Sequence, residues 1–139
     1  MPVPVHPAPY LIELPRYGSE SEGYLTVAEA DKTIPFPVHR TFWTYNTPEL
    51  VVRGRHAHYH TQQVLIAVAG RIVVMTETAL QGVQTFILDR PTLGLYVPPH
   101  AWHTMQYLAG TLQVAIASQP YDEADYIRDY HTFRRIWCA

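Results

Sequence analysis

The chain alternates between short runs of strand-forming residues and residues that end strands, and this alternation limits its fold more than any other feature. The runs are rich in Val, Ile, Tyr, Phe and Thr, and they are bounded by Gly, Pro, Asn and Asp. Helical signal is scarce, apart from a short C-terminal helix expected over Asp122–Tyr130. Many short strands at regular spacing predict an all-β sandwich or jelly roll. The expected strands are Tyr24–Ala28, Arg40–Tyr45, Gln62–Ala69, Arg71–Thr76, Val83–Leu88, Gly94–Val97, Trp102–Leu108 and Leu112–Ser118.

The composition is that of a single globular domain. The 139 residues fit one domain, and 47% of them are hydrophobic whereas 16% are charged. The net charge of −2 gives no overall basic field, so neither nucleic acid nor an anionic membrane is an expected partner. The longest apolar run, Val64–Ala69, is far too short to span a bilayer. The one cysteine, Cys138, rules out a disulfide framework and indicates a cytoplasmic protein.

Residues 1–22 are interpreted as an extended lead-in to the main domain, residues 23–139. Within the lead-in, Tyr10, Ile12 and Leu14 would share one face of a strand. The open edges of a small β domain also invite pairing with a second copy. Five prolines interrupt the segment and exclude the apolar helix of a signal peptide: Pro2, Pro4, Pro7, Pro9 and Pro15.

Histidines stand at every second position in the stretch RGRHAHYHTQQ, residues 53–63. In an extended strand His56, His58 and His60 would point the same way, and Ala57 the other. Three interpretations are open: ligands for a metal ion, groups that move protons, or side chains on a hydrated surface. An imidazole suits the second one, because its ordinary pKa of about 6.5 lets it accept and donate protons near neutral pH.

A second segment, GLYVPPHAWHTM at residues 94–105, contains Pro98 and His103. With His56 and His58 in a first motif, this layout resembles the two motifs of the cupin barrel. The stretches RGRHAH, GLYVPPHAWH and YDEADYIRDYHTF together are similar to the sugar nucleotide 3,4-ketoisomerases, small cupins that make precursors of unusual deoxysugars. Matching stretches upstream, GYLTVAE, IPF and HRTFWTYN, extend the resemblance to about residues 22–134. We therefore expect a cupin or jelly-roll β-barrel with an extended N-terminal segment and a short C-terminal helix.

The resemblance implies an isomerase that moves a carbonyl between C4 and C3 of a dTDP-linked 4-keto-6-deoxyhexose through an enediol(ate), without a cofactor. It assigns the carbon-bound proton to His56 and the two oxygens to His58, a division of roles that the residue pattern alone leaves open. It also implies a homodimer with an exchanged N-terminal strand. Candidate substrate-binding residues are Arg53 and Arg40 for the diphosphate, Trp102 and Tyr96 for the base or sugar, and His103 and Gln63.

A metal site is not predicted. Metal-binding cupins complete the histidine pair with a glutamate, and this chain has Gln62 and Gln63 at the candidate positions. A neutral amide brings no charge to a divalent ion, although three histidines can hold zinc. Three rival functions stay open: a metal-dependent cupin enzyme such as a dioxygenase or isomerase, a non-catalytic sugar-binding cupin, and an epimerase of related architecture.

Overall fold

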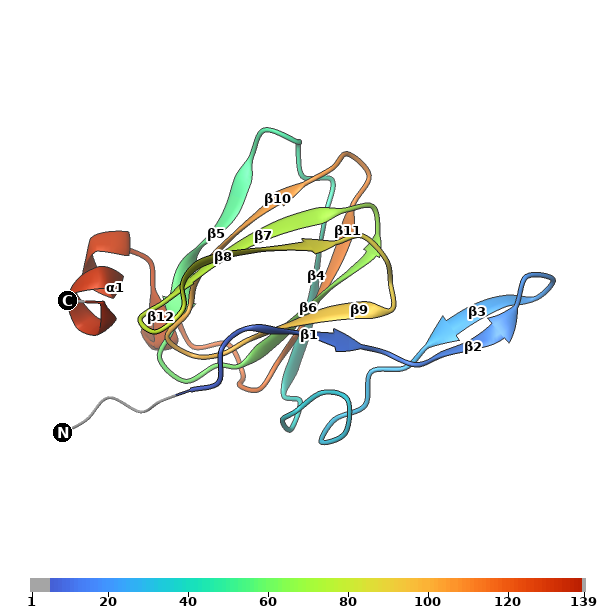
Figure 1. Ribbon diagram of the computed structural model, residues 1–139, viewed down its shortest axis with the longest axis horizontal. Helices are drawn as coiled ribbons and strands as arrows, with labels where there is room; N and C mark the ends of the chain where they lie inside the picture. The colour runs from blue at the N-terminus through green and yellow to red at the C-terminus, as the bar shows by residue number, and fades with distance from the viewer. Residues whose placement is uncertain (1–5, 139) are drawn as a thin grey trace.

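The computed structural model describes residues 6–138, which form two five-stranded sheets packed against each other and a two-stranded hairpin that projects from one end (Figure 1). All strand pairs within these sheets are antiparallel. In spatial order, the first sheet contains β1 (Tyr10–Glu13), β9 (Leu93–Val97), β6 (Gln63–Ala69), β11 (Leu112–Ala117) and β4 (Arg40–Tyr45). The second contains β12 (Tyr126–Ile127), β5 (Val52–His58), β10 (Trp102–Tyr107), β7 (Ile72–Thr78) and β8 (Gly82–Leu88). The hairpin consists of β2 (Arg16–Ser19) and β3 (Gly23–Thr26).

The expectation of an all-β fold is confirmed. Each expected run forms a strand whose ends agree with the prediction to within two residues, and Arg40–Tyr45 is strand β4 from its first residue to its last. The agreement follows from side-chain shape, because β-branched and aromatic residues fit a pleated, half-buried surface.

An apolar core fills the space between the two sheets, and both sheets contribute to it. In β7, Ile72 and Val74 point into this interior. Smaller clusters cover the outer faces: Ile34 and Phe36 lie over the first sheet, and Phe133 of the C-terminal helix lies over the second. Each strand therefore has an inner face on the core, whereas outer faces such as that of β4, where Trp43 is 62% exposed, are only partly covered.

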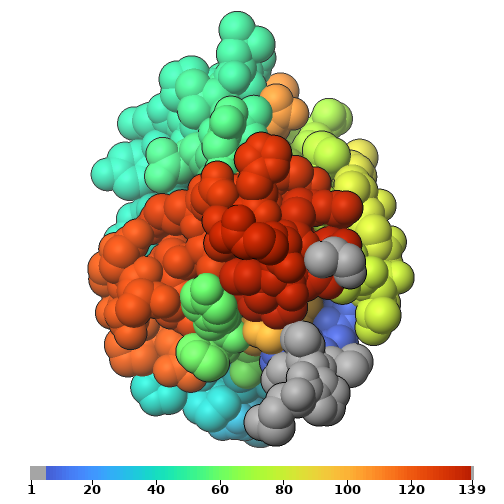
Figure 2. Space-filling model, turned by 90° about the vertical axis from the view of Figure 1, so that its left-hand side faces the viewer, coloured from blue at the N-terminus to red at the C-terminus, as the bar shows by residue number. Residues whose placement is uncertain are grey.

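The C-terminal segment differs from the helix expected over Asp122–Tyr130. Glu123–Asp125 form one 3-10 turn, Tyr126–Ile127 pair with β5 as β12, and helix α1 spans Tyr130–Trp137. Figure 2 shows this segment, orange-red to red, covering the end of the molecule that lies opposite the hairpin.

The buried carboxylate of Asp125 explains the difference. It accepts hydrogen bonds from the backbone N–H groups of His60 and Thr61 and from the Thr61 hydroxyl. These contacts and the pairing of β12 with β5 hold the segment in place of a helix. The helix begins later because Asp129 caps it, accepting the N–H of Thr132 at 2.9 Å.

Strand β1 pairs with β9 of the same chain, with Tyr10 opposite Tyr96. The expected boundary at residue 22 falls between β2 and β3, which pair with each other. Residues 1–5 of the expected lead-in lie outside the described residues. None of the described helices has the length and apolar character that a membrane crossing requires.

Candidate active site

Strand β5 departs from regular geometry just before its histidines. Gly54 and Arg55 have φ angles of 84° and 56°, and the register of β5 against β10 shifts beside them. A Cβ at Gly54 would lie 2.8 Å from the carbonyl oxygen of His103, so only glycine fits. This irregularity is a β-bulge, a feature that re-aims the side chains after it.

His56, His58 and His103 come together on the inner face of the second sheet. Ala57 packs on the outer face, as the alternation predicts. The ring centroid of His56 lies 4.5 Å from that of His103 and 4.9 Å from that of His58. His60 does not share this face, because β5 ends at His58 and the following turn is held by Asp125, which leaves the His60 side chain exposed.

Backbone carbonyls orient two of these rings. Nδ1 of His56 lies 2.9 Å from the oxygen of Gly54, and Nδ1 of His103 lies 3.1 Å from that of Ala101. A carbonyl only accepts, so each Nδ1 carries the proton and each Nε2 keeps a free lone pair. The buried Nε2 atoms of His58 and His103 have no hydrogen-bond partner within residues 6–138.

All three imidazoles are neutral at pH 7. Burial, and secondarily the neighbouring His58, lowers the pKa of His56 to about 4. Burial lowers the pKa of His58 to about 3, with smaller effects from His103 and Arg40. Burial likewise lowers the pKa of His103 to about 3. The cluster therefore presents bases rather than cations.

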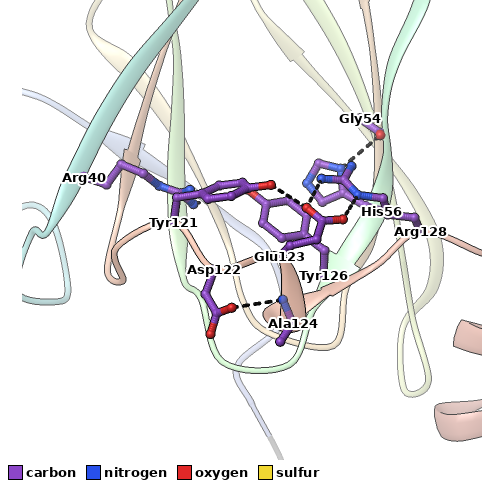
Figure 3. A network of polar contacts seen from close by, with 9 residues as sticks. All are labelled: Arg40, Gly54, His56, Tyr121, Asp122, Glu123, Ala124, Tyr126 and Arg128. Carbon is purple, nitrogen blue, oxygen red and sulfur yellow. Dashed lines mark hydrogen bonds and ion pairs between the residues drawn. The ribbon is translucent and has the colours of Figure 1, made fainter.

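Tyr126 of the C-terminal segment packs against His56 and His58, and Figure 3 shows its ring beside His56. Its ring centroid lies 4.4 Å from that of His58 and 5.0 Å from that of His56. The guanidinium of Arg128 lies over the tyrosine ring, 4.3 Å from its centroid. The C-terminal segment thus brings an aromatic ring and a cation close to the two imidazoles of β5.

Glu123 makes hydrogen bonds within the C-terminal segment. Its carboxylate accepts hydrogen bonds from Nε and Nη2 of Arg128, at 2.6 and 2.9 Å, and from the hydroxyl of Tyr121 (Figure 3). The bonds from Arg128 and then Tyr121 lower the pKa of Glu123 to about 2. The carboxylate is therefore ionised and neutralises one positive charge near His56.

Arg40 reaches the cluster from β4 of the first sheet. Its Nη2 donates to the Tyr126 hydroxyl at 3.4 Å, and its buried Nε has no partner among the described residues. Arg53 is exposed and stands opposite Met105, two residue pairs along the ladder from the pair His56 and His103. The structure brings the first arginine to the histidines and leaves the second nearer the far end of β5.

The two aromatic candidates lie on outer faces. Trp102 packs against Tyr130 and Phe133 of α1, with ring centroids 5.4 and 5.8 Å away. Tyr96 belongs to the cluster that covers the first sheet and stacks on Tyr10 at 4.8 Å. Neither ring is directed at the histidines.

The two glutamines after the histidine strand point in opposite directions. Gln62 accepts the hydroxyl of Tyr96 at 2.8 Å on the outer side. Gln63 is buried and alternates with Val64 of the outer cluster, which places it on the inner face. Of the two candidates for the missing carboxylate position, only Gln63 faces the interior.

One nitrogen from each of His56, His58 and His103 lies within 4.8 Å of the other two. This donor set fits a three-histidine metal site with an open position. Within the described chain it is the only such cluster, and no carboxylate belongs to it.

Comparison with known proteins places this geometry in a family. The model of the FdtA family, described as WxcM-like, C-terminal, matches residues 8–137. The chain belongs to the FdtA family.

Named relatives of this FdtA-family chain are sugar ketoisomerases. It is 37% identical over 117 residues to the TDP-4-oxo-6-deoxy-alpha-D-glucose-3,4-oxoisomerase of Aneurinibacillus thermoaerophilus, and the match covers 84% of each chain. The crystal structure of a 3,4-ketoisomerase from Helicobacter canadensis superposes with a TM-score of 0.88 at 31% identity, covering 94% of this chain and 98% of the other. The ketoisomerase QdtA of Thermoanaerobacterium thermosaccharolyticum in complex with TDP gives a TM-score of 0.87 at 29% identity, with 93% of both chains covered. These likenesses confirm the expected family and its cupin-like fold.

Sequence reasoning missed Tyr126, Glu123 and Arg128 as neighbours of the histidines. They lie in the stretch YDEADYIRDY, which carried part of the resemblance to the family. The helix expected over Asp122–Tyr130 gives its acidic residues no place at the site. The signal that could have found them was the tyrosine and arginine interleaved with the acids, which a hydrated helix face does not require.

Proposed function

We propose that this FdtA-family chain is a sugar nucleotide 3,4-ketoisomerase that acts on a dTDP-linked 4-keto-6-deoxyhexose, with His56 and His58 as its catalytic residues. The observation that carries the proposal is the pair of neutral imidazoles that β5 directs into the interior. The names of its relatives support the reaction and the substrate class.

The reaction requires only proton transfers. An unprotonated nitrogen of His56 takes the proton from C3, and the electron pair of that bond forms a C3–C4 double bond while the C4 carbonyl oxygen becomes an enediolate oxygen. A proton then passes from the C3 hydroxyl to the C4 oxygen by way of His58. The proton held by His56 exchanges with solvent, and its delivery to C4 leaves the ketone at C3. Atoms and electrons balance without an oxidant.

The environment of the histidines supports this division of labour. His56 has its Nδ1 proton engaged by Gly54, so its lone pair is on Nε2, the position needed for a carbon base. A base must be unprotonated in the free enzyme, and burial lowers the pKa of both imidazoles enough to ensure this at neutral pH.

The proposed substrate contacts are the polar groups of the inner faces. Arg40 would bind an anionic oxygen, because its buried Nε lacks a partner within the described chain. His103 offers its Nε2, and Gln63 faces the same interior. Arg53, exposed at the far end of β5, is proposed as a contact for the diphosphate. Trp102 and Tyr96 are proposed to serve packing instead.

Metal independence is part of the proposal. The three histidines would hold a divalent ion, which would supply Lewis-acid stabilisation of an oxygen. The proton transfers proposed for His56 and His58 do not need that help. The neutral Gln63 in place of a carboxylate also weakens the attraction for a cation.

A homodimer is the proposed assembly, and the cytoplasm the proposed location. The hairpin of β2 and β3 exposes Tyr17 and Leu25, each 59% accessible, and apolar groups on a projecting arm indicate a contact surface. An exchanged β1 would make the same pairing with β9 of the partner that it makes here within one chain. Sedimentation equilibrium on the full chain and on a chain starting at Gly18 tests the dimer and the strand exchange.

The decisive experiment is incubation with dTDP-4-keto-6-deoxyglucose in deuterium oxide, followed by NMR of the product. The proposal expects a 3-keto sugar with deuterium at C4, formed equally well after exhaustive chelation. A product with inverted carbons and an unmoved carbonyl would identify an epimerase. Loss of activity on chelation, restored by one divalent ion, would identify a metal enzyme.

A further inference from the structure

A row of polar residues crosses the inner face of the second sheet, one on each of four neighbouring strands. His56 on β5 stands opposite His103 on β10, His103 stands opposite Thr76 on β7, and Thr76 stands opposite Gln84 on β8. We call these four residues the polar row. Two of them, Thr76 and Gln84, have no part in the proton transfers derived above.

The far half of the row faces the interior. Thr76 follows Ile72 and Val74 on the inner face of β7, and Gln84 precedes Phe86, which packs against the same core from β8. Side chains directly opposite each other on antiparallel strands have Cβ atoms about 5 Å apart, so the row is continuous. A ligand that touches His103 therefore lies next to Thr76 as well.

Three residues of this row each have a buried polar side-chain atom without a partner among the described residues. Thr76 is 1% exposed, yet its Oγ1 has no hydrogen-bond partner within residues 6–138, and the same holds for the buried Oε1 of Gln84 and Nε2 of His103. A buried hydroxyl without a partner destabilises a fold, and valine would fill the same space without that cost. Such groups mark the places where a ligand completes the hydrogen bonding.

We propose that Thr76 and Gln84 bind the C2 hydroxyl of the sugar and so make the enzyme selective for substrates that carry it. The inference rests on the proposed function for the substrate class. A 4-keto-6-deoxyhexose has hydroxyls only at C2 and C3 besides its linked C1 oxygen, and the C3 hydroxyl is consumed in the reaction. The C2 hydroxyl is adjacent to the reacting carbon, and it both donates and accepts, which matches an amide oxygen beside a threonine hydroxyl.

Thr76→Val tests this, with Thr111→Val as the matched control. Thr111 is also buried, but its hydroxyl donates to the oxygen of Leu108 at 2.6 Å and accepts the N–H of Arg71 at 3.0 Å. Calorimetry gives the dissociation constants of dTDP-glucose and dTDP-2-deoxyglucose for the wild type and both variants, together with their melting temperatures. Neither ligand turns over, so binding is measured apart from catalysis.

The wild type and Thr111→Val should bind dTDP-glucose about tenfold more tightly than its 2-deoxy form, the factor of one hydrogen bond. In Thr76→Val the ratio should fall to near one, while the melting temperature stays equal to or above that of the wild type. Thr111→Val should melt lower. A wild type that does not distinguish the two ligands, a ratio retained in Thr76→Val, or a loss of stability in Thr76→Val equal to that of the control overturns the proposal.

Isomerase activity, measured separately on dTDP-4-keto-6-deoxyglucose, distinguishes the two levels of failure. An active wild type whose Thr76→Val variant keeps the ligand ratio refutes only the hydroxyl site. If the wild type is inactive but prefers the 2-hydroxyl ligand, and Thr76→Val loses that preference, the isomerase proposal is refuted and the hydroxyl site stands.

Discussion

The two ends of the space between the sheets carry buried polar groups in opposite conditions. At one end Tyr107 donates its hydroxyl to Gln113 at 2.9 Å, and the Thr111 hydroxyl has several backbone partners. At the other end the buried Nε2 of His58 and of His103 have no partner among the described residues. The same strand, β10, contributes to both ends through Tyr107 and His103.

Hydrogen bonding therefore separates the end that stabilises the fold from the end that binds a ligand. A satisfied buried hydrogen bond contributes modestly to stability, whereas an unsatisfied group costs free energy that a ligand recovers. Bulk burial does not separate the two ends, since Tyr107 and His103 are both buried. The presence or absence of hydrogen-bond partners does separate them. Substitutions at the two ends should therefore have opposite consequences for activity and stability.

The largest expected effect is at the unsatisfied end. His56→Asn should lower kcat by about 10²-fold or more, the usual scale for a general base, with little loss of thermal stability. His58→Asn should be similarly impaired. Exchange of the C3 proton with deuterium, followed by NMR, should survive in the His58 variant and disappear in the His56 variant.

His60→Asn is the matched control, because this histidine follows the end of β5 and lies outside the cluster. It should keep the activity of the wild type. Near-normal turnover by His56→Asn would refute its assignment as the carbon base.

A smaller loss is expected across the interior, at Arg40. Arg40→Gln removes the guanidinium whose Nε is buried without a partner in the described chain, so binding of the nucleotide sugar should weaken about tenfold, as for one charged hydrogen bond. Isothermal titration measures the affinity, and Arg90→Gln, which removes an exposed ion pair with Glu13, serves as control. Equal affinities in the two variants would show that Arg40 makes no substrate contact.

At the end with satisfied hydrogen bonds, a substitution should change stability and leave activity unchanged. Gln113→Leu leaves the Tyr107 hydroxyl without its acceptor and should lower the free energy of unfolding by about 1–3 kcal/mol, with kcat/KM unchanged. Urea denaturation measures the first quantity. Adding Tyr107→Phe should recover part of the loss, because the orphaned hydroxyl is then gone. A fall in kcat/KM of Gln113→Leu without a fall in stability would show that this end acts in catalysis rather than in stability.

The two ends should also differ in how their stability responds to pH. The folded protein lowers the pKa of His56 from 6.5 to about 4 and those of His58 and His103 to about 3, so acidification protonates the unfolded chain first. Stability from these histidines is full above pH 6.5 and is lost as the pH drops toward 3, so the melting temperature should fall steadily over that range. Scanning calorimetry should show a shallower fall in His58→Asn and an unaltered one in Gln113→Leu. An equal dependence of melting temperature on pH in the two variants would contradict the lowered pKa of His58.

Much of this molecule follows from local pattern. Strands such as Arg40–Tyr45 and the common face of His56 and His58 follow from residue shape and from the period of two, which neighbouring residues set among themselves. Family motifs added the reaction and the substrate class.

Long-range contacts account for the rest. The period of two divides a strand into two faces without saying which one another element will cover, so Trp102 was a site candidate until α1 was seen to pack on it. The segment around Asp125 does not form the expected helix, because its carboxylate accepts hydrogen bonds from the backbone N–H groups of His60 and Thr61. These residues are 65 and 64 positions away in the chain. Thr76 became a ligand candidate through its register with His103 on β10. Strand register is set by pairing between distant segments, and no window of neighbouring residues contains that information.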